Sequence, residues 1–271
     1  MLIVDSHVHI WESGQPSAVH RQVPALTAEN LLLEMDGAGV SAAIIQPPAW
    51  DPTSNEVAIA ASRQHPDRFA VFGRFELVKD ESPTRVEAWK NRPGMLGLRL
   101  TFEQPHQQDR LTDGSLNWLW AEAEGAGMPI SLLAGNFLPT VGEIARRHPG
   151  LRLLIDHLGM KLRAVDDEAF VNMPQLLALA KLQNIAVKAS AMPGYSSQPY
   201  PFRNIHPHLR AVHEAFGPER MFWGTDITKM SCSWCECVTL FTEELPWLSD
   251  TEKQLIMGRA ICRWLGWELS V

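Results

Sequence analysis

Eight short apolar runs, separated by helical stretches, constrain the fold of this 271-residue chain more than any other sequence feature. Several are almost continuously apolar, as in Ala42–Ile45 and Leu151–Ile155. Such runs are typical of strands buried on both faces, as in a parallel sheet covered by helices. The predicted strands are Leu2–Ile10, Ser41–Pro47, Phe69–Leu77, Met95–Phe102, Pro129–Gly135, Arg152–Leu158, Ile185–Ala191 and Met221–Ile227.

The stretches between these runs carry helix signals. Thr27 can cap a helix over Ala28–Ala38, and Ser54 can cap a second helix that ends near His65. The interval Lys79–Arg92 is charged and only modestly periodic, so it defines no clear helix. The other predicted helices are Asp113–Ala126, Leu138–Arg147, Pro174–Leu182, Pro207–Phe216 and Thr251–Leu265.

A strand followed by a helix, eight times over, predicts a closed (β/α)₈ TIM barrel that takes up residues 1–271 as a single domain. An open doubly wound sheet is the alternative, but the chain has no dinucleotide fingerprint and no phosphate-binding glycine loop to support it. Active sites of closed barrels lie at the carboxyl ends of the strands, so polar residues at those ends are the candidates for chemistry.

Composition excludes several classes of partner. The net charge is −7 and no basic stripe occurs, so we expect no nucleic-acid partner. No apolar run approaches the about 20 residues of a membrane span, and the opening residues lack the basic region of a signal peptide, so we expect a cytoplasmic protein. Oligomeric state is left open, and a homo-oligomer is compatible with the sequence.

The chain has four cysteines, which do not suggest a disulfide scaffold. Three of them stand close together as Cys232, Cys235 and Cys237. A single CxxC with no second pair and no nearby histidine is a weak indication of zinc, so we expect reduced thiols in a loop, with a structural zinc as the alternative.

The strongest chemical motif is Asp5-Ser-His7-Val-His9 in the first predicted strand. Residues two apart in a strand point to the same face, so His7 and His9 project together. At the catalytic end of a barrel, two such imidazoles can share a metal ion or bind a polar substrate. The alternative is a pair of core histidines bonded to the backbone, which is costly unless both rings are satisfied.

Two acidic motifs follow later strands. Gly224-Thr225-Asp226 ends the eighth strand, beside the first in a closed barrel, so Asp226 faces the two histidines and can act as a base or bind a metal. A turn cap is the alternative role. Asp156 and His157 end the sixth strand and point to opposite faces, and of the two we predict that His157 faces the interior.

Three further candidates could contact a substrate. Arg99 lies on the face of its strand opposite Leu98 and Leu100, and an arginine inside a barrel needs an anion, either a substrate carboxylate or an internal ion-pair partner. Lys188 is a similar candidate, although a lysine can extend to the rim. The long loop Met192–Asn204 contains Tyr195, Tyr200 and Arg203 and could close over a ligand or pack on the surface.

These motifs, in this order, resemble the amidohydrolase-related family of the amidohydrolase superfamily, most closely its lactonase branch, which includes 2-pyrone-4,6-dicarboxylate lactonase. The resemblance covers the whole chain. It implies a (β/α)₈ hydrolase with His7, His9, His157 and Asp226 as site residues and with Arg99 binding a substrate carboxylate. Arg203, Tyr195 and Lys188 are further candidates for binding the substrate.

The family resemblance also bears on metal content. Metal-rich members have a histidine or lysine at the end of the fourth or fifth strand, and Pro129–Gly135 offers neither. A two-metal site is therefore not expected. A single zinc held by His7, His9 and Asp226, with His157 as a further candidate, is compatible with the sequence, as is a metal-free site. No organic cofactor is expected.

The sequence therefore predicts a hydrolase that opens a small, anionic, carboxylate-bearing lactone by base-assisted attack of water. Two alternatives remain. A zinc-dependent non-oxidative decarboxylase would use the same histidines and aspartate, although the absent fifth-strand histidine counts against it. A barrel that binds a ligand without turnover is the alternative from another class, and the complete histidine and aspartate set counts against it.

Overall fold

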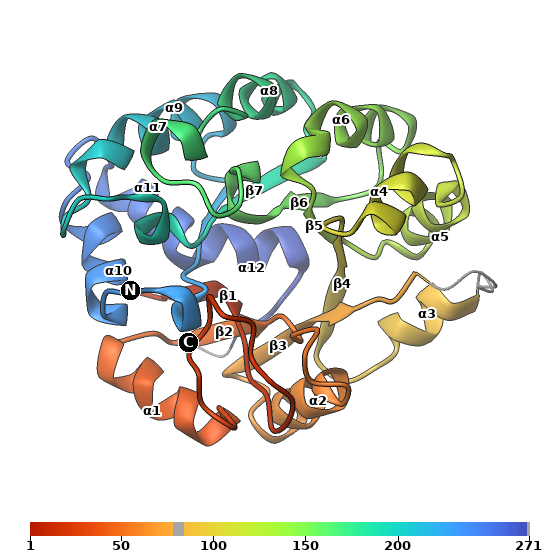
Figure 1. Cartoon of the computed structure of the whole chain (residues 1–271), viewed down its shortest axis with the longest axis horizontal. Helices are drawn as coiled ribbons and strands as arrows, with labels where there is room; N and C mark the ends of the chain where they lie inside the picture. The colour runs from red at the N-terminus through yellow and green to blue at the C-terminus, as the bar shows by residue number, and fades with distance from the viewer. Residues whose placement is uncertain (78–83, 270–271) are drawn as a thin grey trace.

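The computed structural model describes residues 1–77 and 84–269, and its strands form one eight-stranded ring surrounded by helices (Figure 1). Each strand pairs in parallel with the next along the chain. The prediction of a (β/α)₈ barrel is confirmed, because every predicted strand is present, each within its predicted range. The strands are β1 (Val4–Val8), β2 (Ala42–Ile45), β3 (Phe69–Arg74), β4 (Met95–Thr101), β5 (Ile130–Leu133), β6 (Leu153–Ile155), β7 (Ile185–Ala189) and β8 (Met221–Trp223).

Helices cover the outside of this ring, and several match their predicted limits. The α-helices are α1 (Ala28–Ala38), α2 (Ser54–Gln64), α3 (Thr84–Lys90), α4 (Pro105–Thr112), α5 (Asn117–Ala126), α6 (Leu138–Arg147), α7 (Asp166–Ala169), α8 (Met173–Ala178), α9 (His206–Phe216), α10 (Trp234–Thr242), α11 (Asp250–Gln254) and α12 (Ala260–Leu265). A π-helical turn, Leu255–Arg259, joins the last two.

The residues that cap the helices explain which predicted helix starts are correct and which are not. Thr27 caps α1 through a capping box with Asn30, as its sequence indicated. Ser54 does not cap α2, because Thr53 occupies the cap position and the Ser54 hydroxyl donates to the Pro48 carbonyl instead. Helices α4, α7 and α10 were not predicted. Part of the interval Lys79–Arg92 lies outside the described residues, and the rest contains α3.

The ring closes between β1 and β8 through a main-chain hydrogen bond and a buried carboxylate. The Asp226 amide donates to the His7 carbonyl at 2.8 Å. Asp5 of β1 reaches across the same junction, where its carboxylate accepts from the Thr225 amide at 2.9 Å and from the His7 amide at 2.9 Å. Residues just past the last strand are thereby fixed beside the first strand.

Inside the ring, the inward-pointing side chains change character from one end to the other. The layer at the amino end is apolar and packs against α12, which crosses the centre of the view in Figure 1. The layer at the carboxyl end is polar and buried. The apolar layer contains Val4, Ala42, Ile44, Phe72, Leu154, Ala186 and Phe222. The polar layer contains His7, His9, Gln46, Arg99, Ser131, Asp156, Lys188 and Ser190.

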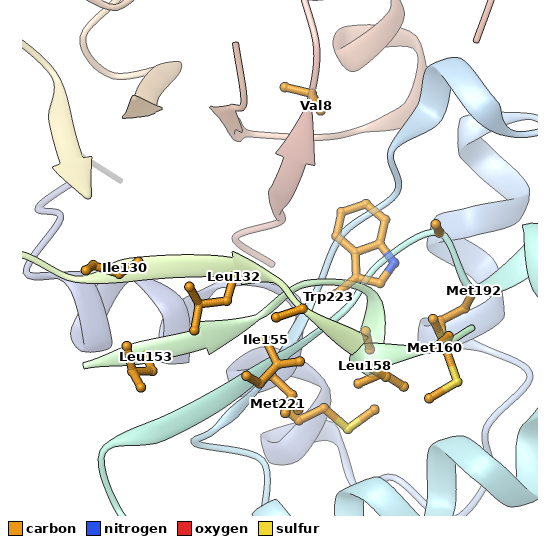
Figure 2. Packing of buried hydrophobic residues seen from close by; sticks show 14 of the residues in the cluster. Val8, Ile130, Leu132, Leu153, Ile155, Leu158, Met160, Met192, Met221 and Trp223 are labelled. Atoms are coloured by element: carbon orange, nitrogen blue, oxygen red, sulfur yellow. The ribbon is translucent and has the colours of Figure 1, made fainter. Parts of the chain in front are cut away.

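The outward-pointing side chains of the strands pack against the surrounding helices. Figure 2 shows this shell, in which Ile130, Leu132, Leu153 and Ile155 come from neighbouring strands and Trp223 comes from β8. Both faces of the sheet are therefore buried, which accounts for the nearly continuous apolar runs in the sequence.

The clustered cysteines occur partly in a helix. Cys235 and Cys237 belong to α10, so the expectation of a loop is wrong for these two residues. All four cysteines are free thiols, and Cys232 Sγ lies 3.6 Å from Cys237 Sγ. Among the described residues, no group that could hold a metal ion includes a cysteine. Across the same residues, no helix is both long enough and apolar enough to pass through a lipid bilayer.

Candidate active site

A β-bulge in β1 aims the two histidines of the first strand into the barrel. Between Asp5 and Val8 the chain of β1 advances three residues while that of β2 advances two. In a regular strand, Val4 and His7 would point to opposite faces. The extra residue restores the phase, so that Val4 faces the apolar layer and His7 faces the polar one. Bulges often aim side chains next to active sites.

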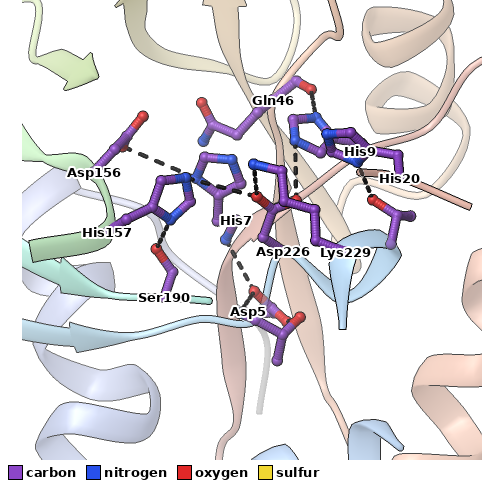
Figure 3. A network of polar contacts seen from close by, with 12 residues as sticks. Asp5, His7, His9, His20, Gln46, Asp156, His157, Ser190, Asp226 and Lys229 are labelled. Atoms are coloured by element: carbon purple, nitrogen blue, oxygen red, sulfur yellow. Dashed lines mark hydrogen bonds and ion pairs between the residues drawn. The ribbon is translucent and has the colours of Figure 1, made fainter. Parts of the chain in front are cut away.

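Asp226 lies at the centre of the polar cluster (Figure 3). Its Oδ1 lies 3.2 Å from His9 Nε2, and its Oδ2 lies 3.6 Å from His157 Nε2. The shortest of these ion-pair contacts is to Lys229, whose Nζ lies 2.7 Å from Asp226 Oδ2. The residue adopts a left-handed backbone conformation, with φ of 51°. Such a conformation is uncommon outside glycine, although aspartate adopts it more readily than most residues, and here it turns the chain directly after β8.

His9 and His157 are each oriented by the ring nitrogen that points away from Asp226. His9 Nδ1 lies 2.5 Å from the Gln46 carbonyl oxygen, and His157 Nδ1 lies 2.8 Å from Ser190 Oγ. His7 differs, because neither of its ring nitrogens makes a hydrogen bond within the described part of the chain. Its ring nevertheless lies 4.6 Å from that of His157, centroid to centroid.

The interior contains both Asp156 and His157, so the prediction that only His157 faces inward is wrong about Asp156. Asp156 continues the inward face of β6 after Leu154, and its side chain is fully buried. His157 has left the strand, because its φ is 52° and its ψ is 37°. The alternation rule applies only while the chain stays extended. The left-handed turn therefore brings a second, consecutive side chain into the site.

Asp156 anchors a buried ionic network. Its Oδ1 lies 2.8 Å from Lys188 Nζ and 2.5 Å from Ser131 Oγ, and its Oδ2 accepts from Arg99 Nε at 2.9 Å. Lys188 does not extend to the rim, because its side chain is fully buried over the Phe72 ring. Arg99 has the internal ion pair that the sequence left open, and it also borders a cavity. Two cations and one carboxylate leave this network with a net positive charge.

The cavity opens above these residues and has a volume of about 560 Å³. His9, Arg99 and Tyr195 line it, so three of the predicted residues meet at one space. Arg203 does not line it: its side chain is 72% exposed and lies 3.8 Å from Glu244 on the surface. Tyr200 bonds to Thr239 and is also outside the lining.

Several residues of this site were not identified from the sequence. His20 lies in the loop after β1, where its Nδ1 meets Thr228 Oγ1 at 2.7 Å, and its ring lies 5.1 Å from that of His9. Lys229 follows Asp226 by three residues, a spacing that could have drawn attention to it. Arg74 and Arg163 also line the cavity, and the positions of their strand and loop could not be judged without the fold.

Burial and mutual charge set the protonation of the cluster. Burial lowers the pKa of His7 well below its usual range and that of His157 to about 3, so both rings are neutral at pH 7. Burial raises the pKa of the Asp226 carboxyl, but the nearby Lys229 ammonium and the contact with His9 outweigh it and hold that pKa well below its usual range. The site therefore combines neutral imidazoles with an ionised carboxylate.

The same set fits a divalent cation. His7, His157 and Asp226 offer ligand atoms that all lie within 4.8 Å of one another, and so do His9, His20 and Asp226. His7 and His9 thus fall into two groups that share Asp226, whereas the sequence suggested one set. Neutral imidazole and carboxylate are the ligands that zinc prefers. The unpartnered buried nitrogens of His7 and His157 are further reason to expect a ligand here.

Histidines on the first barrel strand and an aspartate after the last, at the carboxyl ends of a (β/α)₈ ring, define a class of barrel enzymes. Comparison with protein families makes this specific: residues 4–266 match the model of the amidohydrolase family, and the chain belongs to this family. It is a hydrolase of that family, as its sequence motifs indicated.

Individual relatives support the same placement. The chain is 24% identical over 236 residues to L-fucono-1,5-lactonase of Burkholderia ambifaria, a match that covers 82% of this chain and 79% of the relative. Its fold is similar to that of a zinc-bound amidohydrolase from Burkholderia multivorans, with a TM-score of 0.83, 21% identity and coverage of 99% and 100% of the two chains. A probable 2-pyrone-4,6-dicarboxylic acid hydrolase from Acinetobacter baumannii, with citric acid bound, has a TM-score of 0.75, 16% identity and coverage of 98% and 100%.

Proposed function

We propose that this protein hydrolyses a small lactone that carries a carboxylate. The observation that carries the proposal is the buried, ionised Asp226 carboxylate, which contacts His157 and His9, together with the cavity that His9 and Arg99 line. A base, polar groups for a developing oxyanion and a cation for a substrate anion are the parts that ester hydrolysis needs. The similarity to L-fucono-1,5-lactonase supports a cyclic ester as the substrate.

In this mechanism Asp226 accepts a proton from water, and the water attacks the lactone carbonyl. His9 and His157 contact the carboxylate, and His7 lies beside His157. The unpartnered N–H of His7, or a cation that these residues hold, would stabilise the tetrahedral oxyanion. Ring opening breaks the bond between the carbonyl carbon and the ring oxygen. Asp226 then returns its proton to the departing alkoxide, which yields a hydroxy acid.

His7, His157 and Asp226 are the residues that would hold a single zinc ion, with His9 and His20 as the neighbouring group. Such an ion would supply Lewis acidity toward a carbonyl oxygen. The fifth strand contributes Ser131 and no histidine to the interior, and Ser131 is bonded to Asp156. We therefore expect at most one divalent ion in each chain.

Arg99 would bind the substrate carboxylate. Its Nε donates to Asp156, and the residue also lines the cavity, where its guanidinium would meet the substrate anion. The buried network to which it belongs has one positive charge more than it has negative charges, so an anion at this place is favoured. Tyr195, which is buried beside the same cavity, would pack against the substrate ring.

The test is a panel of lactones, with and without a carboxylate, combined with elemental analysis of the purified protein. Release of acid from the lactones, with carboxylated ones preferred, is the expected result. Release of carbon dioxide from aromatic acids would instead assign the decarboxylase alternative, and binding without turnover would assign a ligand-binding barrel. Two equivalents of a chelatable divalent metal would contradict the single-ion expectation.

A further inference from the structure

The mouth of the active-site cavity collects exposed apolar side chains. Val19, Leu162 and Val165 are 52%, 38% and 48% exposed, and all three line the cavity. Among the described residues only four other large apolar side chains are exposed to such a degree, and none of those borders this space: Met1, Val23, Leu33 and Val171. Single exposed apolar residues are ordinary, whereas a group around one opening indicates an apolar ligand or partner.

Two loops carry these side chains, and each loop is hydrogen-bonded to a neighbouring segment. Val19 belongs to the loop after β1, which is held by the hydrogen bond from the Arg21 amide to the Thr228 carbonyl. Leu162 and Val165 precede α7, where the Asp166 carboxylate accepts from the Ser197 amide at 2.9 Å. The apolar mouth is therefore a preformed part of the cavity.

The same cavity thus has two chemical regions. Its floor presents Arg99, His9 and Lys229, which suit the anionic and reacting parts of a substrate. Its mouth presents the three exposed apolar side chains, and Arg163, between Leu162 and Val165 in the sequence, also lines the cavity. Because its volume of about 560 Å³ lies within the range of about 300–1,000 Å³ typical of drug-sized ligands, a single small ring would leave much of it empty.

We propose that the substrate is an amphipathic lactone, whose ring lies on the polar floor and whose alkyl or aryl substituent extends along Val19, Leu162 and Val165. The inference rests on the proposed lactone hydrolysis and adds the class of substituent to it. Burial of that substituent against the mouth would contribute binding free energy in proportion to its apolar area.

A homologous series of lactones with straight alkyl substituents, from methyl to hexyl, tests this directly. We expect kcat/KM to rise by about threefold to fourfold for each added methylene until the mouth is filled. Calorimetric binding of the same lactones measures the chain-length dependence without requiring turnover. A flat series in both measurements would overturn the inference, whereas hydrolysis of the methyl lactone alone would leave the proposed function standing.

Substitutions at the mouth of the cavity, called rim variants below, test where the substituent binds. Leu162→Gln and Val165→Gln should flatten the dependence of kcat/KM on chain length, because they replace apolar surface that the longer substituents would cover. Neither variant adds a charge that could repel an anionic substrate. Val171→Gln is the matched control, since Val171 is 57% exposed and lies outside the cavity lining.

Equal slopes in the rim variants and the control would contradict a substituent subsite. The same would follow if the rim variants convert a dimer into a monomer, measured by light scattering, without altering the slope, because a second copy of the chain would then be the partner of this surface. If no lactone is hydrolysed, the calorimetric slopes of the rim variants and the control still decide the inference.

Discussion

The two ends of the barrel interior are built from the same strands and carry opposite chemistry. At the amino end, Leu154, Ala186 and Phe222 pack with α12 in a layer of apolar side chains. Two residues further along the chain from Leu154 and Ala186, Asp156 just past β6 and Lys188 of β7 form a buried ion pair at 2.8 Å. At β6 and β7, one inward-facing residue therefore stabilises the fold, and the next inward-facing residue, two positions later, belongs to the site.

This contrast separates stability from chemistry along the barrel axis. The apolar layer gains free energy from burial, whereas the polar layer must offset the desolvation of its charges through mutual contacts. Substitutions at the amino end should therefore change the free energy of unfolding, and substitutions at the carboxyl end should change catalysis or binding.

The largest effect should come from Asp226→Asn at the carboxyl end. The substitution keeps the shape of the side chain and removes the base, and loss of a general base costs about 10²- to 10⁴-fold in rate. We expect kcat on the best lactone to fall by this amount with a small change in melting temperature. Retention of most of the rate would transfer the role of base to another residue, with His157 as the first to test.

Phe222→Ala at the amino end should show the opposite pattern. Removal of a buried phenylalanine side chain costs about 3–5 kcal/mol in the free energy of unfolding, which a denaturant titration measures. Phe222 packs in the apolar layer, and it precedes Asp226 by four residues although it is in register with Lys188, so kcat of the folded fraction should stay near that of the parent. Phe222→Leu provides a milder variant if the alanine protein does not accumulate. A large loss of kcat in folded Phe222→Leu would show that the two ends are coupled.

Arg99→Met tests the anion-binding part of the polar end. A lost charge-assisted contact to a substrate carboxylate is worth roughly 2–4 kcal/mol, so KM for a carboxylated lactone should rise about 30- to 1,000-fold. A neutral lactone of similar shape should be affected little, and thermal unfolding of the variant separates this effect from loss of the Asp156 contact. Equal losses for both substrates would make Arg99 structural.

The smallest effect concerns Lys229, the cation that contacts Asp226 in this structure. Because its ammonium occupies Oδ2, a divalent ion must compete with it for the carboxylate. Lys229→Met should therefore bind Zn²⁺ about tenfold more tightly than the parent after chelator treatment, or by about 1.4 kcal/mol. Lys161→Met, which removes an exposed lysine paired with Glu168, is the control. Unchanged affinity would mean that Lys229 moves away at no cost.

The strands were predictable because burial on both faces leaves a plain apolar pattern. Helix limits depended on the caps: Thr27 and Gly39 delimit α1 as their residue types suggest. The start of α4 escaped prediction because its capping box is made by Gln104 and Gln107, which are not typical of that motif.

Site residues were predictable only where the chain is extended, because there successive side chains alternate between the two faces of the sheet. This rule correctly placed His7 and His9 together. It missed Asp156 as an interior residue because His157 leaves the strand in a left-handed turn. No local pattern could show that His20 lies near Asp226, since a loop determines its position. The contact of Lys229 with Asp226 could have been suspected from their three-residue spacing. The predicted contribution of Arg203 rested on its loop alone, and the structure places it at the surface.

The site lies at the junction where β8 meets β1 and the ring closes. The Asp226 amide donates to the His7 carbonyl, so local opening of this junction would separate the Asp226 carboxylate from the histidines while the other strand pairs stay intact. Amide hydrogen exchange at Asp226 would report such local opening apart from global unfolding. The rate of thermal inactivation would then follow the rate at which the β1–β8 junction opens, and inactivation would precede global unfolding of the barrel.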